Sequence, residues 1–169
     1  MKTLFTATFI LGMVLISFAQ TVPTLSSLSP ANEATDVDRS ADLVATFSEN
    51  IKLGSGTITI NYTGSTGPKF ATYTIPSASE VTVSSNQLII DPTSDMSPGD
   101  DFHVTITSGA ILSTADAVYP GFSDETTWAF TTIDDVAPLI TNTTPYDGSN
   151  YFFLSGGLSI NFNEDIQEG

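Results

Sequence analysis

The sequence predicts an all-β sandwich of about seven strands. From Thr21 onward, apolar and polar residues alternate with period two, which puts every second side chain on one face of a strand. The alternation breaks about every 8 to 12 residues at Gly, Pro, Asn, Asp or Ser, a spacing typical of sandwiches built from short strands. After residue 19 no stretch of ten or more residues has helical periodicity.

The first 19 residues have the layout of a secretory signal peptide. Lys2 precedes an apolar run at 9–16, and Ser17, Phe18 and Ala19 form a small-x-small cleavage pattern. The run is shorter than the about 20 apolar residues that cross a bilayer. We therefore expect cleavage after Ala19 and an extracellular or cell-surface location without a membrane span, with a retained anchor as the alternative. The sequence has no cysteine, so an exported domain must be stabilised by its core.

The chain is strongly acidic, with 19 Asp and Glu, 4 Lys and Arg, and a formal net charge of −15. After Ala19 the bases are Arg39, Lys52 and Lys69. This charge repels polyanions, which argues against nucleic acids and anionic membranes as partners. The acids either keep the surface soluble or form carboxylate-rich loops that bind divalent cations.

The first strands follow from the alternation and from the turn residues between them. One strand is expected within 23–29, where a Ser-Pro pair ends it, and a polar loop follows at 31–41. The next strand begins at Leu43 and ends at Phe47, and both of these side chains point into the core. The polar segment at 48–50 then turns the chain.

Two hairpins are expected in the middle of the chain. In the first, segments 57–60 and 70–75 flank a Gly-rich loop. In the second, segments 81–83 and 88–90 flank a tight turn around Asn86. Each hairpin joins neighbouring segments of the sequence, so both pairs are predicted to be antiparallel.

The last third of the module contains two expected strands and a long connection between them. The strand at 102–106 is half-buried, and the final strand at 127–132 places Trp128 and Phe130 in the core. The connection at 108–127 is irregular, and apolar side chains are expected to hold it against the core. These side chains are Ala110, Ile111, Ala115 and Val118.

The segment at 42–54 recurs at 157–169. With an offset of 115 and no gaps, eight of the 34 residue pairs that begin at Thr21 and end at Gly54 are identical. Self-similarity of this kind is typical of tandem arrays of one module. The expected organisation is a signal peptide at 1–19, one complete module at 20–135, and the truncated start of a second repeat at 136–169.

Several motifs, taken together, resemble a known family. They are LVATFSE at 43–49, GSGTITI at 54–60, SPGDDFHVTI at 97–106, SGAI at 108–111 and WAFTT at 128–132. As a set they are similar to the SbsA-type bacterial Ig-like domain. The resemblance implies an Ig-like Greek-key β-sandwich of a kind repeated in S-layer proteins, adhesins and other surface proteins. Phe102 replaces the usual Tyr after Pro-Gly, so a hydroxyl of the tyrosine-corner kind is missing.

The sequence does not contain a recognisable catalytic set. It has no G-x-S-x-G motif, and its single histidine, His103, is expected on the solvated face of a strand. The leading hypothesis is a non-catalytic structural spacer or adhesive unit whose partners are neighbouring repeats and a surface glycan or protein. The alternative is a carbohydrate- or protein-binding accessory module of a larger secreted enzyme. An exposed aromatic cluster would favour it, with Tyr62, Tyr73, Tyr119 and Phe122 as candidates.

Calcium is the one cofactor that the sequence suggests. In a sandwich with alternating strands, the last strand ends at the same pole as the first and fifth loops, and acids of the second repeat face that junction. Calcium takes about six to eight oxygen ligands and suits flexible carboxylate loops. The alternative is that these acids only keep the surface soluble. The candidate metal ligands are Asp36, Asp38, Asp100, Asp101, Asp134, Asp135, Glu164 and Asp165.

Overall fold

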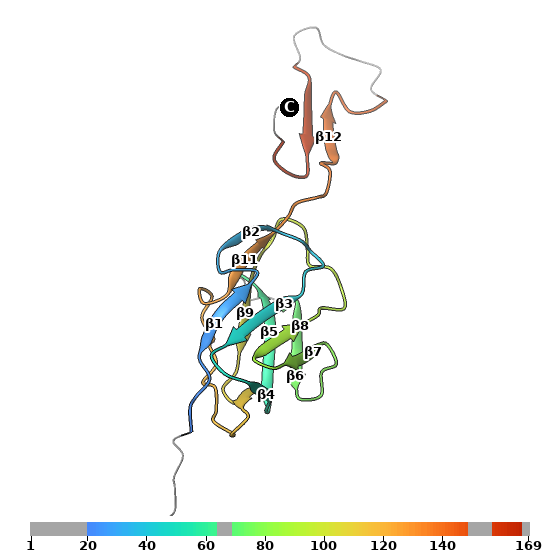
Figure 1. Cartoon of the computed structure of the whole chain (residues 1–169). Helices are drawn as coiled ribbons and strands as arrows, with labels where there is room; N and C mark the ends of the chain where they lie inside the picture. Colours follow the sequence, from blue (N-terminus) through green and yellow to red (C-terminus); the bar gives the residue numbers. More distant parts are fainter. Residues whose placement is uncertain (1–19, 64–68, 149–156, 167–169) are drawn as a thin grey trace, which may run out of the picture.

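The structure is a computed structural model that describes residues 20–63, 69–148 and 157–166. The expected signal peptide at 1–19 lies outside these residues. The chain before the linker, which comprises residues 133–139, forms one β-sandwich, and the chain after it forms a separate hairpin (Figure 1). No helix within the described ranges is long and apolar enough to span a membrane.

The first sheet has four antiparallel strands in the order β1-β3-β8-β7. They are β1 (Leu25–Ser29), β3 (Leu43–Phe47), β8 (Gln87–Ile90) and β7 (Val81–Ser84). All four strands were predicted from alternation and turn residues. The strand β3 is central, and its Leu43 and Phe47 are buried as expected.

The second sheet has five strands in the order β2-β11-β9-β5-β6. They are β2 (Ala34–Val37), β11 (Ala129–Thr132), β9 (Asp101–Ile106), β5 (Gly56–Tyr62) and β6 (Ala71–Ile75). The strand β2 corrects the sequence analysis, which predicted a loop there. Its four residues are mostly polar, and parallel pairing with β11 makes it a strand, so no local pattern could show it.

Two further short strands, β4 (Ile51–Leu53) and β10 (Ile111–Ser113), form a two-stranded sheet. The prediction that Ala115 and Val118 hold the long connection to the core is wrong, because both are exposed. Ala117 and Tyr119 are buried instead. The pairing of β10 with β4 sets which side chains face inward, and the sequence predicted neither strand.

The core lies between the two large sheets. Its bulkiest fully buried side chains include Trp128, Phe47 and Phe102. Phe102 stacks on Phe130 with ring centroids 5.9 Å apart, so its ring contributes an aromatic contact to the core. The predicted core positions of Trp128 and Phe130 are confirmed.

The hairpin after the linker consists of β12 (Ile140–Thr144) and β13 (Ser159–Phe162). Its pairing reproduces that of β1 and β3 with an offset of 115: Leu25 faces Phe47, and Ile140 faces Phe162. The β-bulge falls at the same place in both pairs. The sequence repeat is therefore also a structural repeat. Unlike Leu43 of β3, the corresponding Leu158 is 80% exposed.

Candidate functional site

The loops that carry the candidate metal ligands meet at the pole of the sandwich next to the linker. Backbone hydrogen bonds join them: Met96 N–H donates to Arg39 O at 2.9 Å, and Gly99 N–H donates to Ile133 O at 3.2 Å. Ile133 N–H in turn donates to Val37 O at 2.9 Å. The three segments that the strand directions placed at one pole are thus neighbours.

Arg39 organises this pole, a role that was not predicted from the sequence. Its Nε donates to Met96 O at 2.7 Å, and its guanidinium lies 2.9 Å from the Asp135 carboxylate. Both side chains of the ion pair are partly exposed, so its net contribution to stability is small. The negative charge of Asp135 is nevertheless balanced by the positive charge of Arg39, which the chain itself supplies. The one sequence feature that could have pointed to Arg39 is that it is the only arginine in the sequence.

Two other predicted ligands are held by their own loops. Asp38 accepts hydrogen bonds from the Ser40 N–H and hydroxyl, both at 2.8 Å, and the backbone bond from Ser40 is the main cause that lowers the pKa of Asp38. Asp101 accepts a 2.5 Å hydrogen bond from the Thr131 hydroxyl. These carboxylates stabilise turns and strand pairing at the pole.

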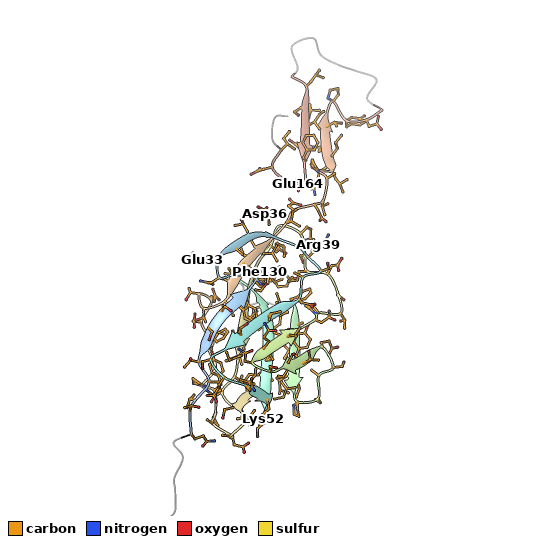
Figure 2. All side chains as sticks on the ribbon, in the orientation of Figure 1. Glu33, Asp36, Arg39, Lys52, Phe130 and Glu164 are labelled. Carbon is orange, nitrogen blue, oxygen red and sulfur yellow. The ribbon has the colours of Figure 1, made fainter. Side chains whose placement is uncertain are left out.

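Asp134 and Glu164 come together across the linker. Desolvation raises the pKa of Glu164, and a hydrogen bond with Asp134 and the charge of Asp134 raise it further. Glu164 is partly exposed as a whole, but its Oε1 is shielded and has no hydrogen-bond partner among the described residues. Figure 2 shows Glu164 at the end of the sandwich where Asp36 and Arg39 lie, opposite Lys52.

The eight candidate ligands therefore do not form one cluster. The structure brings Asp134 and Glu164 together, whereas none of the contacts described for residues 20–63, 69–148 and 157–166 joins Asp36, Asp100 or Asp165 to that pair. Within the part of the chain that the structure describes, no three acidic or histidine side chains lie close enough to hold one metal ion.

A second site lies on the outer face of the five-stranded sheet, where a hollow of about 460 Å³ opens. Its floor includes Asn61 and His103, which are 3% and 5% exposed. His103 is on the outer face as expected, but the prediction that it is solvated is wrong. Burial lowers the pKa of His103, the neighbouring Lys69 lowers it further, and the charges of Glu125 and Asp124 oppose this. The imidazole is therefore neutral at pH 7.

The four aromatic candidates do not form one exposed cluster. Tyr73 and Tyr119 are buried, and Tyr119 makes an edge contact with Phe47 at 5.1 Å. Tyr62 is half-buried and packs on Phe102 at 5.0 Å. Only Phe122 lines the hollow. Alternation with Thr72 and Thr74 puts Tyr73 on the inner face of β6, whereas Tyr119 lies in an irregular segment where no period indicates its burial.

Solved structures with a similar arrangement include CopC from Methylosinus trichosporium OB3b, with 13% identity, a TM-score of 0.48, and 68% of this chain and 97% of that chain covered. The N-terminal part of the bacterial S-layer protein SbsC has 19% identity, a TM-score of 0.44, and 75% and 30% covered. Domains 1–6 of SbsC have 17% identity and a TM-score of 0.44, with 75% of this chain and 17% of that chain covered. The chain thus spans less than a third of either SbsC chain.

No curated protein has a matching sequence. Residues 19–132 match the family described as bacterial Ig-like domain. The matched range contains both large sheets, including β2, and it ends with β11 just before the linker. The chain belongs to the bacterial Ig-like domain family.

Proposed function

We propose that this chain is a non-catalytic extracellular module of the SbsA type that acts as a spacer or adhesive unit in a repeat-containing bacterial surface or secreted protein. The family assignment supports a structural role. The signal-peptide pattern that ends at Ala19 supports export. The absence of cysteine fits a module whose stability comes from its core alone.

The observation that carries the proposal is the repeated hairpin. The pairs Leu25–Phe47 and Ile140–Phe162 share one register, and the flanking backbone bond from Ser48 N–H to Thr24 O recurs from Asn163 N–H to Leu139 O. A module that recurs with a fixed offset is the basis of a linear array, in which each unit contacts only its neighbours. We place the boundary between the two units at residues 135 and 136.

The exposed face of the second hairpin fits the same reading. Leu158 and Ile160 are 80% and 55% exposed, whereas the equivalent Leu43 and Ala45 are fully buried under the second sheet. An isolated two-stranded hairpin is at best marginally stable in water. We therefore assign β12 and β13 to the start of a second module of the same fold.

We also propose that calcium binds at the junction, with Asp134 and Glu164 as its first ligands. Their close approach and the shielded Oε1 of Glu164 support this, because a cation would relieve the repulsion between the two carboxylates. Two carboxylates supply at most four of the about six to eight oxygens that calcium takes. Backbone carbonyls, water or Asp100, which follows Gly99 beside Asp134, would supply the rest.

Fractionation of the source bacterium tests the main proposal. An antibody against the purified chain should detect the protein in the surface or secreted fraction, and its mature N-terminus should be Gln20. Detection in the cytoplasm with an intact N-terminus at Met1 would overturn the proposal. A cytoplasmic enzyme should serve as the control for cell lysis.

A further inference from the structure

The floor of the hollow is a grid of polar side chains from three adjacent strands. Thr59 of β5 pairs with Thr72 of β6 on one side and with Thr105 of β9 on the other. Asn61 and His103 form the next cross-strand pair. Neighbouring strands lie about 4.8 Å apart. The hydroxyls of Thr59 and Thr72 have no hydrogen-bond partner among the residues that the structure describes, so both are available to a ligand.

The wall of the hollow is a fixed part of the fold. Ile106 and Phe122 exchange two backbone hydrogen bonds of 2.9 Å at the edge of β9. The chain then leaves this edge and returns at Trp128, whose carbonyl accepts a 2.9 Å bond from Val104 N–H. The excursion between these two contacts carries Ser123 and Glu125, which line the hollow. The side chain of Phe122 gives the wall an apolar surface.

Asp124 holds this excursion in one conformation. Its carboxylate accepts hydrogen bonds from the backbone N–H and hydroxyl of Thr126, at 3.0 and 2.8 Å. It also accepts a 2.7 Å bond from Thr127 N–H and bonds from the Thr127 hydroxyl. This network lowers the pKa of Asp124 well below its usual range. A wall preorganised in this way reduces the ordering cost that a ligand would otherwise have to overcome.

The chemistry of the hollow excludes several classes of occupant. Of the three strands beneath it, β5 and β9 are already paired on both sides, so an added β-strand could pair only with the free edge of β6, in the plane of the sheet and not over the hollow. The net charge of −15 disfavours polyanions. The floor is polar, so it does not suit a lipid chain. Lys69 and Glu125 both line it and their formal charges are opposite, so its lining favours neither sign.

We propose that this hollow binds a neutral saccharide. Sugar hydroxyls both donate and accept hydrogen bonds, which matches the threonine hydroxyls of the floor. The Asn61 amide already donates to His103 O and Thr105 Oγ1 at 3.4 Å, and His103 Nδ1 lies 3.2 Å from Thr63 Oγ1, so these two side chains support the floor. The ring of Phe122 offers an apolar surface to one face of a sugar. The volume lies within the range of about 300 to 1,000 Å³ that is usual for small-ligand sites. The inference deepens the proposed function, because it gives an adhesive module a surface glycan as its partner.

The test uses the purified full chain. An array of neutral and acidic oligosaccharides identifies a binder, and calorimetry and amide NMR shifts then measure and locate its binding. Thr59→Val removes one unpaired hydroxyl while keeping the side-chain shape, and Phe122→Leu removes the aromatic ring. Each change should weaken binding of a neutral oligosaccharide about tenfold, the equivalent of one good interaction. Thermal melts of both variants check that the fold is kept.

Thr82→Val is the matched control, because Thr82 is an exposed threonine on β7 of the other sheet. It should leave binding unchanged. If no neutral saccharide binds at millimolar concentration, the inference is wrong. It is equally wrong if the amide shifts lie outside the hollow, or if Thr59→Val and Thr82→Val weaken binding equally. The result is independent of the fractionation experiment, so failure of one proposal does not imply failure of the other.

Discussion

The indole N–H of Trp128 donates a 3.0 Å hydrogen bond to the carbonyl of Pro30. This bond joins the residue that precedes β11 to the residue that follows β1, 98 positions earlier. Trp128 is fully buried, so the bond satisfies a donor that has no access to water. The contact links the two ends of the module through its core.

Trp128→Phe should destabilise the module by about 2 to 4 kcal/mol, because the change leaves the Pro30 carbonyl without this donor and opens a cavity. Urea unfolding followed by circular dichroism measures the effect. Phe102→Leu is a suitable control, since it reduces core volume without removing a hydrogen bond. An unchanged urea midpoint for Trp128→Phe would contradict the role given to this contact.

Gly121→Ala should also be strongly destabilising. Gly121 has φ +75°, and a Cβ at this position would lie 2.1 Å from the carbonyl oxygen of Ile106. We expect a loss of at least about 2 kcal/mol in the free energy of unfolding. Gly109→Ala is the matched control, because Gly109 has φ +85° but its nearest contact is an ordinary 3.4 Å. Equal losses of unfolding free energy in the two variants would mean that the backbone conformation alone, and not the clash with Ile106, accounts for the glycine at position 121.

His103 should make stability depend on pH. Its pKa in the folded chain lies below the ordinary unfolded value of about 6.5. The unfolded chain therefore binds the proton first, and the contribution of His103, fully present above pH 6.5, is lost as pH falls toward the folded pKa. Unfolding measured at pH 7.5 and 5.5 should show a smaller decrease for His103→Gln than for the wild type. An equal decrease in both proteins would argue against a buried neutral imidazole.

Calcium should raise the melting temperature of the full chain if the junction binds it. Asp134→Asn with Glu164→Gln should abolish that increase, because it removes both proposed ligands. Asp116→Asn is the control, since Asp116 pairs with Lys52 at the end of the sandwich opposite Glu164 (Figure 2). No calcium-dependent shift, or a shift that survives the double substitution, would exclude the site.

The sequence predicted the strands that have their own alternating pattern, including β3, β9 and the strand containing Phe130. It did not predict β2, β4 or β10, because these short strands depend on partners far away in the chain. Val37 is the one buried residue of β2, and a single apolar residue produces no period. The recurrence of segment 42–54 at 157–169 was the strongest signal in the sequence. Because the matching residues have the same spacing, the pairs β1–β3 and β12–β13 have the same register.

The candidate sites were harder to predict than the strands. Strand direction correctly brought the acidic loops to one pole, but it could not show that Arg39 pairs with Asp135. Alternation correctly placed His103 on the outer face. Its burial depends on the wall around Phe122, which leaves the edge of the sheet in an irregular segment without periodicity. Which side chains pair with one another, and where the surface is hollowed, depend on the tertiary structure. Local sequence patterns do not predict either of them.

Amide hydrogen exchange on the full chain tests most directly whether one complete module is followed by the start of a second. We predict slow exchange in β3, β5, β8 and β9, where the strands are paired on both sides and packed in the core. Amides of β12 and β13, including Ile160, should exchange much faster, because the described part of the chain places no second sheet over this hairpin. Protection of Ile160 equal to that of Ala45 would contradict the account, since the hairpin would then be an integral part of the first module.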